Sequence, residues 1–394
     1  MKKIFLLLLF FVFNFGLNAQ NPFFPIKKSN QWSYIDLKGK EVLKINANLT
    51  NLGNFYEGLA AVQDEKTKKY GYIDTKGQWA IKPIYEAAGY FDKGMAIVML
   101  ACDENCLKEG EGLMNFFYTL LIDKTGKVVL RDNSQDTEPY KRFWFADFNQ
   151  EERLVAIWGL GVGDFKSLMN RKGEVISDRI VSMSKLEIVD GLAACRSIKP
   201  SYIDKSGKKV IDASMYNFIR DFSNGYAWLD LTTEIKGKTD KDGQPMLKEE
   251  LVLIDKKGKQ VLKFSKDDYS FAREVGEGLF PMILKEEISD SRRTIFMNLK
   301  GQKALPKTYK EAQSFKNGLA FVKEINDSFG YIDKRGKFVI ELSAENFNLE
   351  NTMFGDFNAG GYAFIYERDV VFDNVFVKGI LLKNGQYFPK FVTE

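Results

Sequence analysis

The stretch Tyr70-Gly71-Tyr72-Ile73-Asp74-Thr75-Lys76-Gly77 decides the fold, because its pattern recurs along most of the chain. The pattern, here called the hairpin phrase, is an apolar pair, then Asp or Asn, two variable residues, Gly and a short apolar strand. A partial copy, Leu381-Leu382-Lys383-Asn384-Gly385, follows eight full ones. Repetition at this period predicts an array of similar units. The eight full copies have their Asp or Asn at Asp36, Asp74, Asp123, Asn170, Asp204, Asp255, Asn298 and Asp333.

The Asp-x-x-Gly part of the hairpin phrase is typical of a tight turn between two strands. The Asp side chain accepts hydrogen bonds from backbone N–H groups two residues on, and Gly adopts the positive φ that ends the turn. Asn170 and Asn298 replace Asp in two copies. Since Asn offers the same short acceptor without the charge, the pattern favours a structural turn over a ring of catalytic or metal-binding aspartates.

A second recurring phrase, the Phe-Gly phrase, consists of an aromatic or apolar residue, two more residues, Gly and an alternating strand. The unit around residues 145–157 lacks this Gly. Each unit therefore reads as a hairpin, a third short strand and a fourth strand that leads into the next unit. No 3.6-residue apolar periodicity of useful length appears, so the chain is predicted to be all-β. Clear copies of the phrase begin at Phe55, Phe91, Phe222, Phe315 and Phe357.

Together the two phrases resemble the WG-repeat family, whose consensus runs Trp-Gly-Tyr-Ile-Asp-x-x-Gly-Lys, then a strand ending in Pro, then Phe-x-x-Gly-Leu-Ala-x-Val. The copy that runs from Tyr70 through Pro83 to Val98 is the most similar. The Trp-Gly dipeptide itself is not kept in register, and Trp158-Gly159 is out of phase. The resemblance implies no chemistry, because such repeats are interaction modules.

About four strands in each unit of roughly 40 to 50 residues match a propeller blade better than the shorter rung of a β-helix. We therefore expect an all-β repeat protein, a β-propeller of about eight short units. The terminal hairpin at residues 381–387 is expected to pair with the N-terminal unit and close the ring. An open β-solenoid is the alternative.

The N-terminus has the order of a secretory signal peptide. Lys2 and Lys3 precede an apolar run from Ile4 to Phe15, and Ala19 precedes a polar Gln20. This pattern predicts a cleaved signal at residues 1–19 and a β-repeat domain at residues 20–394. An uncleaved anchor is the alternative, but the apolar run is shorter than the roughly 20 residues that span a bilayer. The protein is therefore expected to be exported, to the periplasm or the cell surface, with no transmembrane segment after cleavage.

The charge and the amino-acid composition exclude several classes of function. The formal net charge is +4, so nucleic acid is not an expected partner. The chain contains no His, which removes His-dependent triads, His zinc ligands and the imidazole base. We expect a non-catalytic binding or scaffold protein of the bacterial cell envelope that needs no metal or cofactor. Its partner would be a protein or polysaccharide. The alternative is a glycan-cleaving propeller enzyme that uses carboxylates only.

Three insertions beyond the minimal unit are where contacts with a partner are expected. The first, residues 101–117, holds Cys102 and Cys106, which could form a local disulfide. The second, residues 132–147, holds Tyr140, Arg142 and Trp144, the predicted ligand contacts, unless these aromatics belong to the core of a degenerate strand.

The third insertion, residues 230–250, contains Asp240-Lys241-Asp242-Gly243. A hairpin turn explains this stretch better than a calcium loop, which would need further acidic ligands. The remaining cysteine, Cys195, occupies an apolar position of a repeat strand and is predicted to be a small buried residue.

Overall fold

The computed structural model describes the main part of the repeat region, and all of its regular elements there are strands. The predicted signal peptide lies outside the described residues. No apolar helix of membrane-spanning length occurs within them. The described residues are 23–28, 31–46, 48–101, 117–131, 143–149, 154–159, 165–170, 180–181, 188–196, 198–285, 293–345, 347, 351–368, 375–389 and 391–392.

The strands follow one another in short antiparallel sets. The first part of the chain forms β1 (Phe24–Lys28), β2 (Gln31–Ile35), β3 (Glu41–Lys44), β4 (Leu49–Thr50), β5 (Leu59–Asp64), β6 (Tyr70–Asp74), β7 (Trp79–Tyr85), β8 (Ala87–Ala88), β9 (Met95–Ala101), β10 (Phe117–Asp123) and β11 (Val128–Arg131). The middle forms β12 (Phe143–Asn149), β13 (Leu154–Gly159), β14 (Phe165–Asn170), β15 (Ile180–Val181), β16 (Ile188–Val189), β17 (Leu192–Cys195), β18 (Ser201–Asp204), β19 (Lys209–Asp212), β20 (Phe218–Ile219), β21 (Tyr226–Thr239), β22 (Pro245–Asp255) and β23 (Gln260–Ser265). The last part forms β24 (Tyr269–Ala272), β25 (Leu279–Leu284), β26 (Thr294–Asn298), β27 (Tyr309–Ala312), β28 (Ala320–Glu324), β29 (Phe329–Ile332), β30 (Phe338–Leu342), β31 (Thr352–Phe354), β32 (Tyr362–Arg368), β33 (Val375–Leu382), β34 (Tyr387–Pro389) and β35 (Phe391–Val392).

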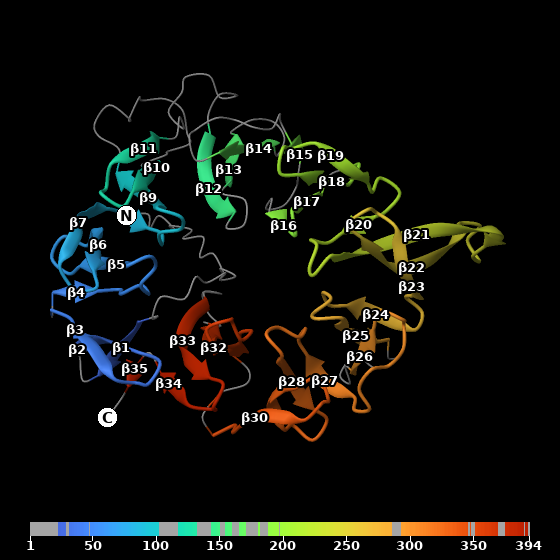
Figure 1. The fold of residues 1–394 in the computed structure, drawn as a ribbon. Coiled ribbons are helices and arrows are strands. Elements are labelled where there is room, and N and C mark those ends of the chain that lie inside the picture. Colours follow the sequence, from blue (N-terminus) through green and yellow to red (C-terminus); the bar gives the residue numbers. More distant parts are fainter. Residues whose placement is uncertain are drawn as a thin grey trace.

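These strands make nine units arranged in a ring (Figure 1), which is the architecture of a β-propeller. Within the described residues, seven sheets have four strands each, and one seven-stranded sheet joins two consecutive units through the pair Thr294↔Tyr309. The partial hairpin phrase, residues 381–385, belongs to the complete four-stranded sheet β31–β34. In chain order, the units are β1–β3 with β35, β4–β7, β8–β11, β12–β15, β16–β19, β20–β23, β24–β26, β27–β30 and β31–β34.

The hairpin phrase forms the turn that its sequence predicts. In unit 2, Gly77 N donates to Asp74 O at 2.9 Å, while Lys76 N and Gln78 N donate to Asp74 Oδ1 at 2.9 and 3.0 Å. Asn298 accepts the equivalent two bonds through its Oδ1, at 2.9 and 3.1 Å. The turn therefore needs a short acceptor and no charge, which confirms the interpretation of this phrase.

This turn makes glycine more important than the acid before it. Gly336 has φ +78°, and a Cβ there would lie 3.3 Å from Tyr309 Oη. We expect Gly336→Val to lower the free energy of unfolding by at least about 1–2 kcal/mol, because a β-branched residue is strained at positive φ. Asp333→Asn should cost much less, because Asn298 already makes the same bonds. Urea unfolding of both variants measures the difference, and equal losses would point to a role for the Asp333 charge.

The Phe-Gly phrase forms a second, two-residue turn. In unit 2, Tyr56 and Leu59 exchange backbone hydrogen bonds at 2.8 and 3.0 Å, and the two residues between them have φ of +51° and +86°. The strand after this turn pairs with the next hairpin phrase, as Leu59↔Asp74 shows. Each sheet therefore takes two strands from one sequence repeat and two from the next. The hydrogen-bonded unit is offset by two strands from the unit that the sequence suggests.

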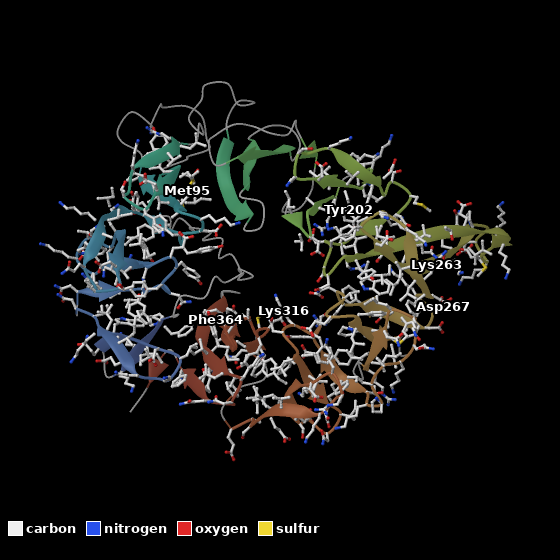
Figure 2. The ribbon with its side chains drawn as sticks, viewed as in Figure 1. Met95, Tyr202, Lys263, Asp267, Lys316 and Phe364 are labelled. Atoms are coloured by element: carbon white, nitrogen blue, oxygen red, sulfur yellow. The ribbon has the colours of Figure 1, made fainter. Side chains whose placement is uncertain are left out.

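The core lies between neighbouring sheets, and the tyrosine of the hairpin phrase connects them. Tyr72 packs against Phe91 of unit 3 with ring centroids 4.7 Å apart, and its hydroxyl donates to Gly89 O at 2.7 Å. Burial raises the pKa of Tyr72 well above its ordinary value, so the hydroxyl keeps its proton. The same hydroxyl link to the following unit joins Tyr34 to Gly53, Tyr202 (Figure 2) to Arg220, and Tyr331 to Gly355.

The same kind of contact between a strand and a turn glycine recurs between neighbouring units, including the last and the first. The fourth strand of one unit covers the turn glycine of the next, as Leu43 covers Gly77 and Ile81 covers Gly126. Phe388 of unit 9 covers Gly39 of unit 1 in the same way. In addition, β35 pairs in parallel with β1 through Lys27↔Phe391 and Lys28↔Val392.

The closing strand differs from the expected one. The terminal hairpin was expected to pair with unit 1, but β33 pairs with β32 through pairs such as Ala363↔Leu381, and β34 pairs with β33 in the same sheet. Strand β35, a few residues later, adds to unit 1 in the edge position that β4 holds in unit 2. The reason is that β31 and β32 supply the two partners that the partial phrase needs for a complete sheet.

Candidate functional site

The predicted contact residues fall mostly outside the described part of the chain. This is the case for Tyr140 and Arg142, and also for Cys102 and Cys106. Trp144 lies in β12, where its backbone pairs with Trp158. The insertion was expected to run to residue 147, but from residue 143 the chain is the edge strand of unit 4. Trp144 therefore belongs to a sheet and not to a connecting loop.

The strands that the insertions connect place the start and the finish of each insertion at one end of the ring. Because the four strands of a unit alternate in direction, the turns after the first and third strands lie at one end, and the other connections lie at the opposite end. We call these the turn end and the insertion end. Residues 102–116 connect β9 to β10, and residues 132–142 connect β11 to β12. Both connections begin and finish at the insertion end.

The third insertion is a projecting hairpin at the same end. Strands β21 and β22 continue past their sheet neighbours. They are paired from Leu231↔Glu250 to Glu234↔Leu247 and, after a register shift, again at Thr239↔Pro245. This segment, residues 231–250, is here called the arm, and it extends outward from the ring in Figure 1. At its tip, Asp240 Oδ1 accepts from Asp242 N and Gln244 N, both at 2.9 Å. The turn interpretation is thereby confirmed, and the described residues hold no cluster of three potential metal ligands from His, Cys, Asp and Glu.

An Arg between two Phe side chains lies beside the base of the arm. The guanidinium of Arg220 is 5.3 Å from the ring centroid of Phe218 and 4.7 Å from that of Phe271. The two rings come from the first strands of adjacent units, β20 and β24, and are 47% and 38% exposed. Large exposed aromatic groups around a cation are typical of contact sites. We call these three residues the Phe-Arg-Phe site.

This site departs from the repeat. Phe218 stands four residues before Phe222 of the Phe-Gly phrase, and Phe271 stands four before Val275. Units 2, 3 and 8 have Asn51, Ala87 and Glu311 at the same place, so the repeat fold does not require an aromatic there. A residue that the fold does not need, on an exposed position, is a candidate for function.

Ion pairs fix the Phe-Arg-Phe site and the arm base. Arg220 Nη1 lies 2.7 Å from Asp230 Oδ1, and Lys266 Nζ lies 2.9 Å from Asp230 Oδ2. At the base of the arm, Glu250 is bound by Lys248 at 2.7 Å and by Lys263, labelled in Figure 2, at 2.6 Å. Burial alone would raise the pKa of Glu250, but the two lysines outweigh it and the pKa is lowered. Glu250 is therefore a charged structural anchor.

More exposed apolar side chains surround this region. Ile198, in the connection between β17 and β18, is 89% exposed, and Met215, before β20, is 64% exposed. Both connections are at the insertion end of units 5 and 6. Arg196, two residues before Ile198, donates from its Nε to the backbone oxygen of Ile219, the residue between Phe218 and Arg220, at 2.9 Å. Cys195, next in the chain, is 4% exposed in β17, as predicted for a small buried residue.

Sequence reasoning missed the Phe-Arg-Phe site because Phe in a strand is usually read as core. The signal was present, however. Once the Phe-Gly phrases are aligned, the residue four places before Phe222 is aromatic where most other copies have a small or polar residue. The register of β20 then decides that Phe218 faces outward while Ile219 is 1% exposed.

The ring of short antiparallel sheets, joined by interleaved repeats, defines a β-propeller repeat protein. The chain contains WG repeats: the profile of the WG containing repeat matches residues 32–67, 70–100, 201–229 and 296–327. A search of curated proteins finds no match by sequence.

Solved structures are similar in fold alone. A crystal structure of the eukaryotic initiation factor aligns with a TM-score of 0.56 at 9% identity, covering 94% of this chain and 95% of that one. BamB from Moraxella catarrhalis aligns at 0.37 and 11% identity, covering 78% and 95%. The β-propeller domain of the Trilobed protease from Pyrococcus furiosus aligns at 0.32 and 13%, covering 80% and 98%.

Proposed function

We propose that this chain is a non-catalytic binding protein of the bacterial cell envelope, and that it docks a protein partner at the insertion end of units 5 to 7. The observation that carries the proposal is the half-exposed pair Phe218 and Phe271 around Arg220. Aromatic and Arg side chains of this kind supply most of the binding energy in protein interfaces. Neighbouring Ile198 and Met215 extend the apolar area.

A protein partner suits this surface better than a polysaccharide. The aromatic residues are Phe, which has no polar group, and their exposed neighbours are aliphatic. Arg220 is already paired with Asp230, and Lys266 is paired with the same carboxylate. Few polar groups therefore remain for sugar hydroxyls, whereas apolar side chains of a protein would gain from burial there.

The alternative of a carboxylate-only enzyme has less support. A glycosidase needs one carboxyl with a raised pKa as acid and a second carboxylate beside it. Burial raises the pKa of Asp356, and the nearby Glu274 adds to the rise, but the Asp356 side chain is 40% exposed and lies 3.8 Å from Lys316 Nζ. Glu250 is the buried charged residue in the described part of the chain, and its pKa is lowered by Lys248 and Lys263. An acid held in its ionised form cannot donate the proton that this mechanism requires.

The double variant Phe218→Ala, Phe271→Ala tests the site. With an envelope protein captured by the wild-type chain and identified by mass spectrometry, we expect the Kd to rise at least about 30-fold, the effect of losing about 2 kcal/mol at an interface hot spot. Calorimetry or surface plasmon resonance gives the Kd.

The matched control is Val42→Ala, Val339→Ala, which changes side chains that are 38% and 51% exposed on fourth strands of units 1 and 8. This control should bind as the wild type does. Equal binding by all three proteins would mean that the partner docks elsewhere. Cleavage of a glycan by the wild type, lost on Asp356→Asn, would favour the enzyme.

Export is the second part of the proposal and is tested separately. Protein recovered from the native envelope should have the intact mass of a chain that starts at Gln20, because signal peptidase cleaves after a small residue such as Ala19. A recovered chain that retains residues 1–19 would indicate an uncleaved anchor. Recovery from the cytoplasm alone would contradict export.

A further inference from the structure

The junction between units 9 and 1 lacks links that other junctions have. Tyr34, Tyr72, Tyr202 and Tyr331 each bind the following unit through a hydroxyl. In unit 9 the equivalent residue is Leu381, which has no hydroxyl, as is also true of Leu121, Leu253 and Phe296 in units 3, 6 and 7. This junction must therefore be held by other contacts.

A second recurring link joins Phe-Gly turns of neighbouring units. Gly94 N donates to Glu57 Oε2 at 2.9 Å, Gly225 N to Asp190 Oδ2 at 2.6 Å, and Gly318 N to Glu277 Oε1 at 2.9 Å. Unit 1 has no such turn, because its edge strand β35 comes from the other end of the chain. Within the described residues, the closing junction therefore lacks both kinds of link.

At the junction between units 9 and 1, apolar packing and a short strand pair replace the tyrosine hydroxyl link and the link between Phe-Gly turns. Phe24 of unit 1 meets Tyr362 and Phe364 of unit 9 edge to face, with centroids 4.9 and 6.1 Å apart. Strand β35 adds only two residue pairs to β1. Because local opening follows the weakest set of contacts, this junction is where the ring is expected to open first.

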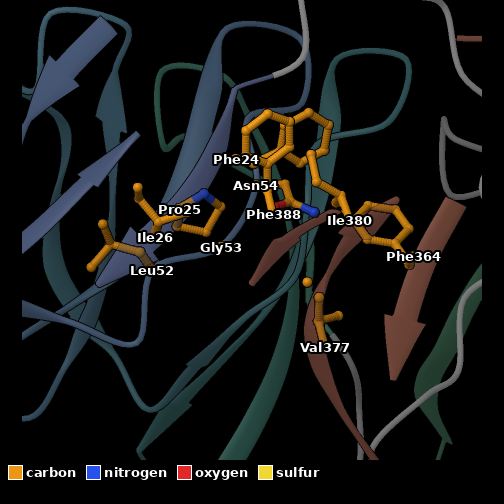
Figure 3. Close-up of a pocket in the computed structure, with 11 residues that line it drawn as sticks. Phe24, Pro25, Ile26, Leu52, Gly53, Asn54, Phe364, Val377, Ile380 and Phe388 are labelled. Atoms are coloured by element: carbon orange, nitrogen blue, oxygen red, sulfur yellow. The ribbon is translucent and has the colours of Figure 1, made fainter. Parts of the chain in front are cut away.

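A cavity that is partly open to solvent lies in this junction (Figure 3). Its volume is about 120 Å³, and it lies between β1, the segment after β4, and strands β32 to β34. Phe24, Ile26, Leu52, Phe364, Ile380 and Phe388 supply most of its apolar wall. The one polar side chain of the lining is Asn54. Apolar cavities of about 150 Å³ lined by such residues bind benzene or xenon, whereas drug-sized ligands need about 300 Å³ or more.

We propose that this cavity binds a small apolar molecule with a single ring, and that binding holds the propeller closed. The cavity walls come from units 1, 2 and 9, so the site is complete only while the ends of the chain are joined. A ligand that fits the closed form alone must stabilise it, by mass action. The site is separate from the Phe-Arg-Phe site, so neither proposal depends on the other.

Benzene is the probe for this proposal, and hydrogen exchange is the readout. At about ten times its Kd, benzene should raise protection about tenfold in residues 24–35 and 375–382, because the open form is depleted by that factor. Protection in residues 226–255 of unit 6 should not change. No effect of benzene, or an equal effect in all units, would overturn the proposal.

Variants separate the cavity from general solvent effects. Val377→Phe should fill the cavity from one wall, keep the closed ring and abolish the response to benzene. Leu52→Phe fills it from the opposite wall and serves if the first variant does not fold. Val339→Phe, at a site 51% exposed on unit 8, should respond as the wild type does. A filled cavity that still responds to benzene would place the ligand elsewhere and refute the assignment.

Discussion

A chain that ends at Lys378 is expected to lose hydrogen-exchange protection in residues 32–62 as well as in its last unit. The truncation removes half of β33 and all of β34 and β35. Unit 1 then loses both the Phe388 contact over Gly39 and its edge strand. Two sheet edges and their apolar faces become exposed together, so destabilisation should spread across the ring and promote aggregation.

The control for this truncation shortens the arm. Replacing residues 235–246 by an Asn-Gly turn joins the paired residues Glu234 and Leu247, removes exposed chain and leaves every junction intact, so protection in residues 32–62 should match the wild type. If the chain that ends at Lys378 also kept full protection there, the units would behave as an open array. In such an array the loss of an end unit removes only one interface.

The second large effect is expected at Gly330, in the position of the Gly of the family's Trp-Gly pair. Its φ is +151°, and a Cβ would lie 2.1 Å from Ile340 O on the neighbouring strand β30. Gly330→Ala should lower the free energy of unfolding by about 2–5 kcal/mol. Backbone strain contributes about 1–2 kcal/mol, and the clash contributes about 1–3 kcal/mol. The urea unfolding curve gives the loss.

Gly318 in the same unit is the matched control. Its φ is +84°, and a Cβ there would meet no atom within 4 Å. Gly318→Ala should therefore cost only the strain, about 1–2 kcal/mol. If both variants lost the same amount, the close approach of β30 would not be the reason for glycine at position 330.

The turns and the fold class could be predicted because local residues determine them. Asp74 and Asn298 bind the backbone within four residues, so their role is visible in the sequence. The pairing partners could not be predicted in the same way. Whether the strand after Gly58 joins the hairpin before it or after it depends on contacts between distant residues, such as Tyr72 and Phe91. The order of the two phrases in the sequence is the same for either pairing, so the sequence alone does not distinguish them.

The candidate site was harder to predict than the fold. Tyr140, Arg142 and Trp144 were chosen as aromatic and basic residues in an apparent insertion, yet from residue 143 that segment is a strand. Phe218 and Phe271 lie 53 positions apart in the sequence. Only the side-by-side arrangement of two units brings both rings to Arg220. No spacing rule within one repeat predicts such a contact.

The two-strand offset between repeat and sheet has a consequence for how such genes can grow. One repeat encodes the second half of one sheet and the first half of the next, and so it carries a whole junction, as Tyr72 with Phe91 illustrates. A duplicated repeat would therefore insert a ready-made interface and leave no unmatched strand. The number of units in the ring can therefore change by one with each duplication, while the segments at the two chain ends, β1 and β35, still pair with each other and close the ring.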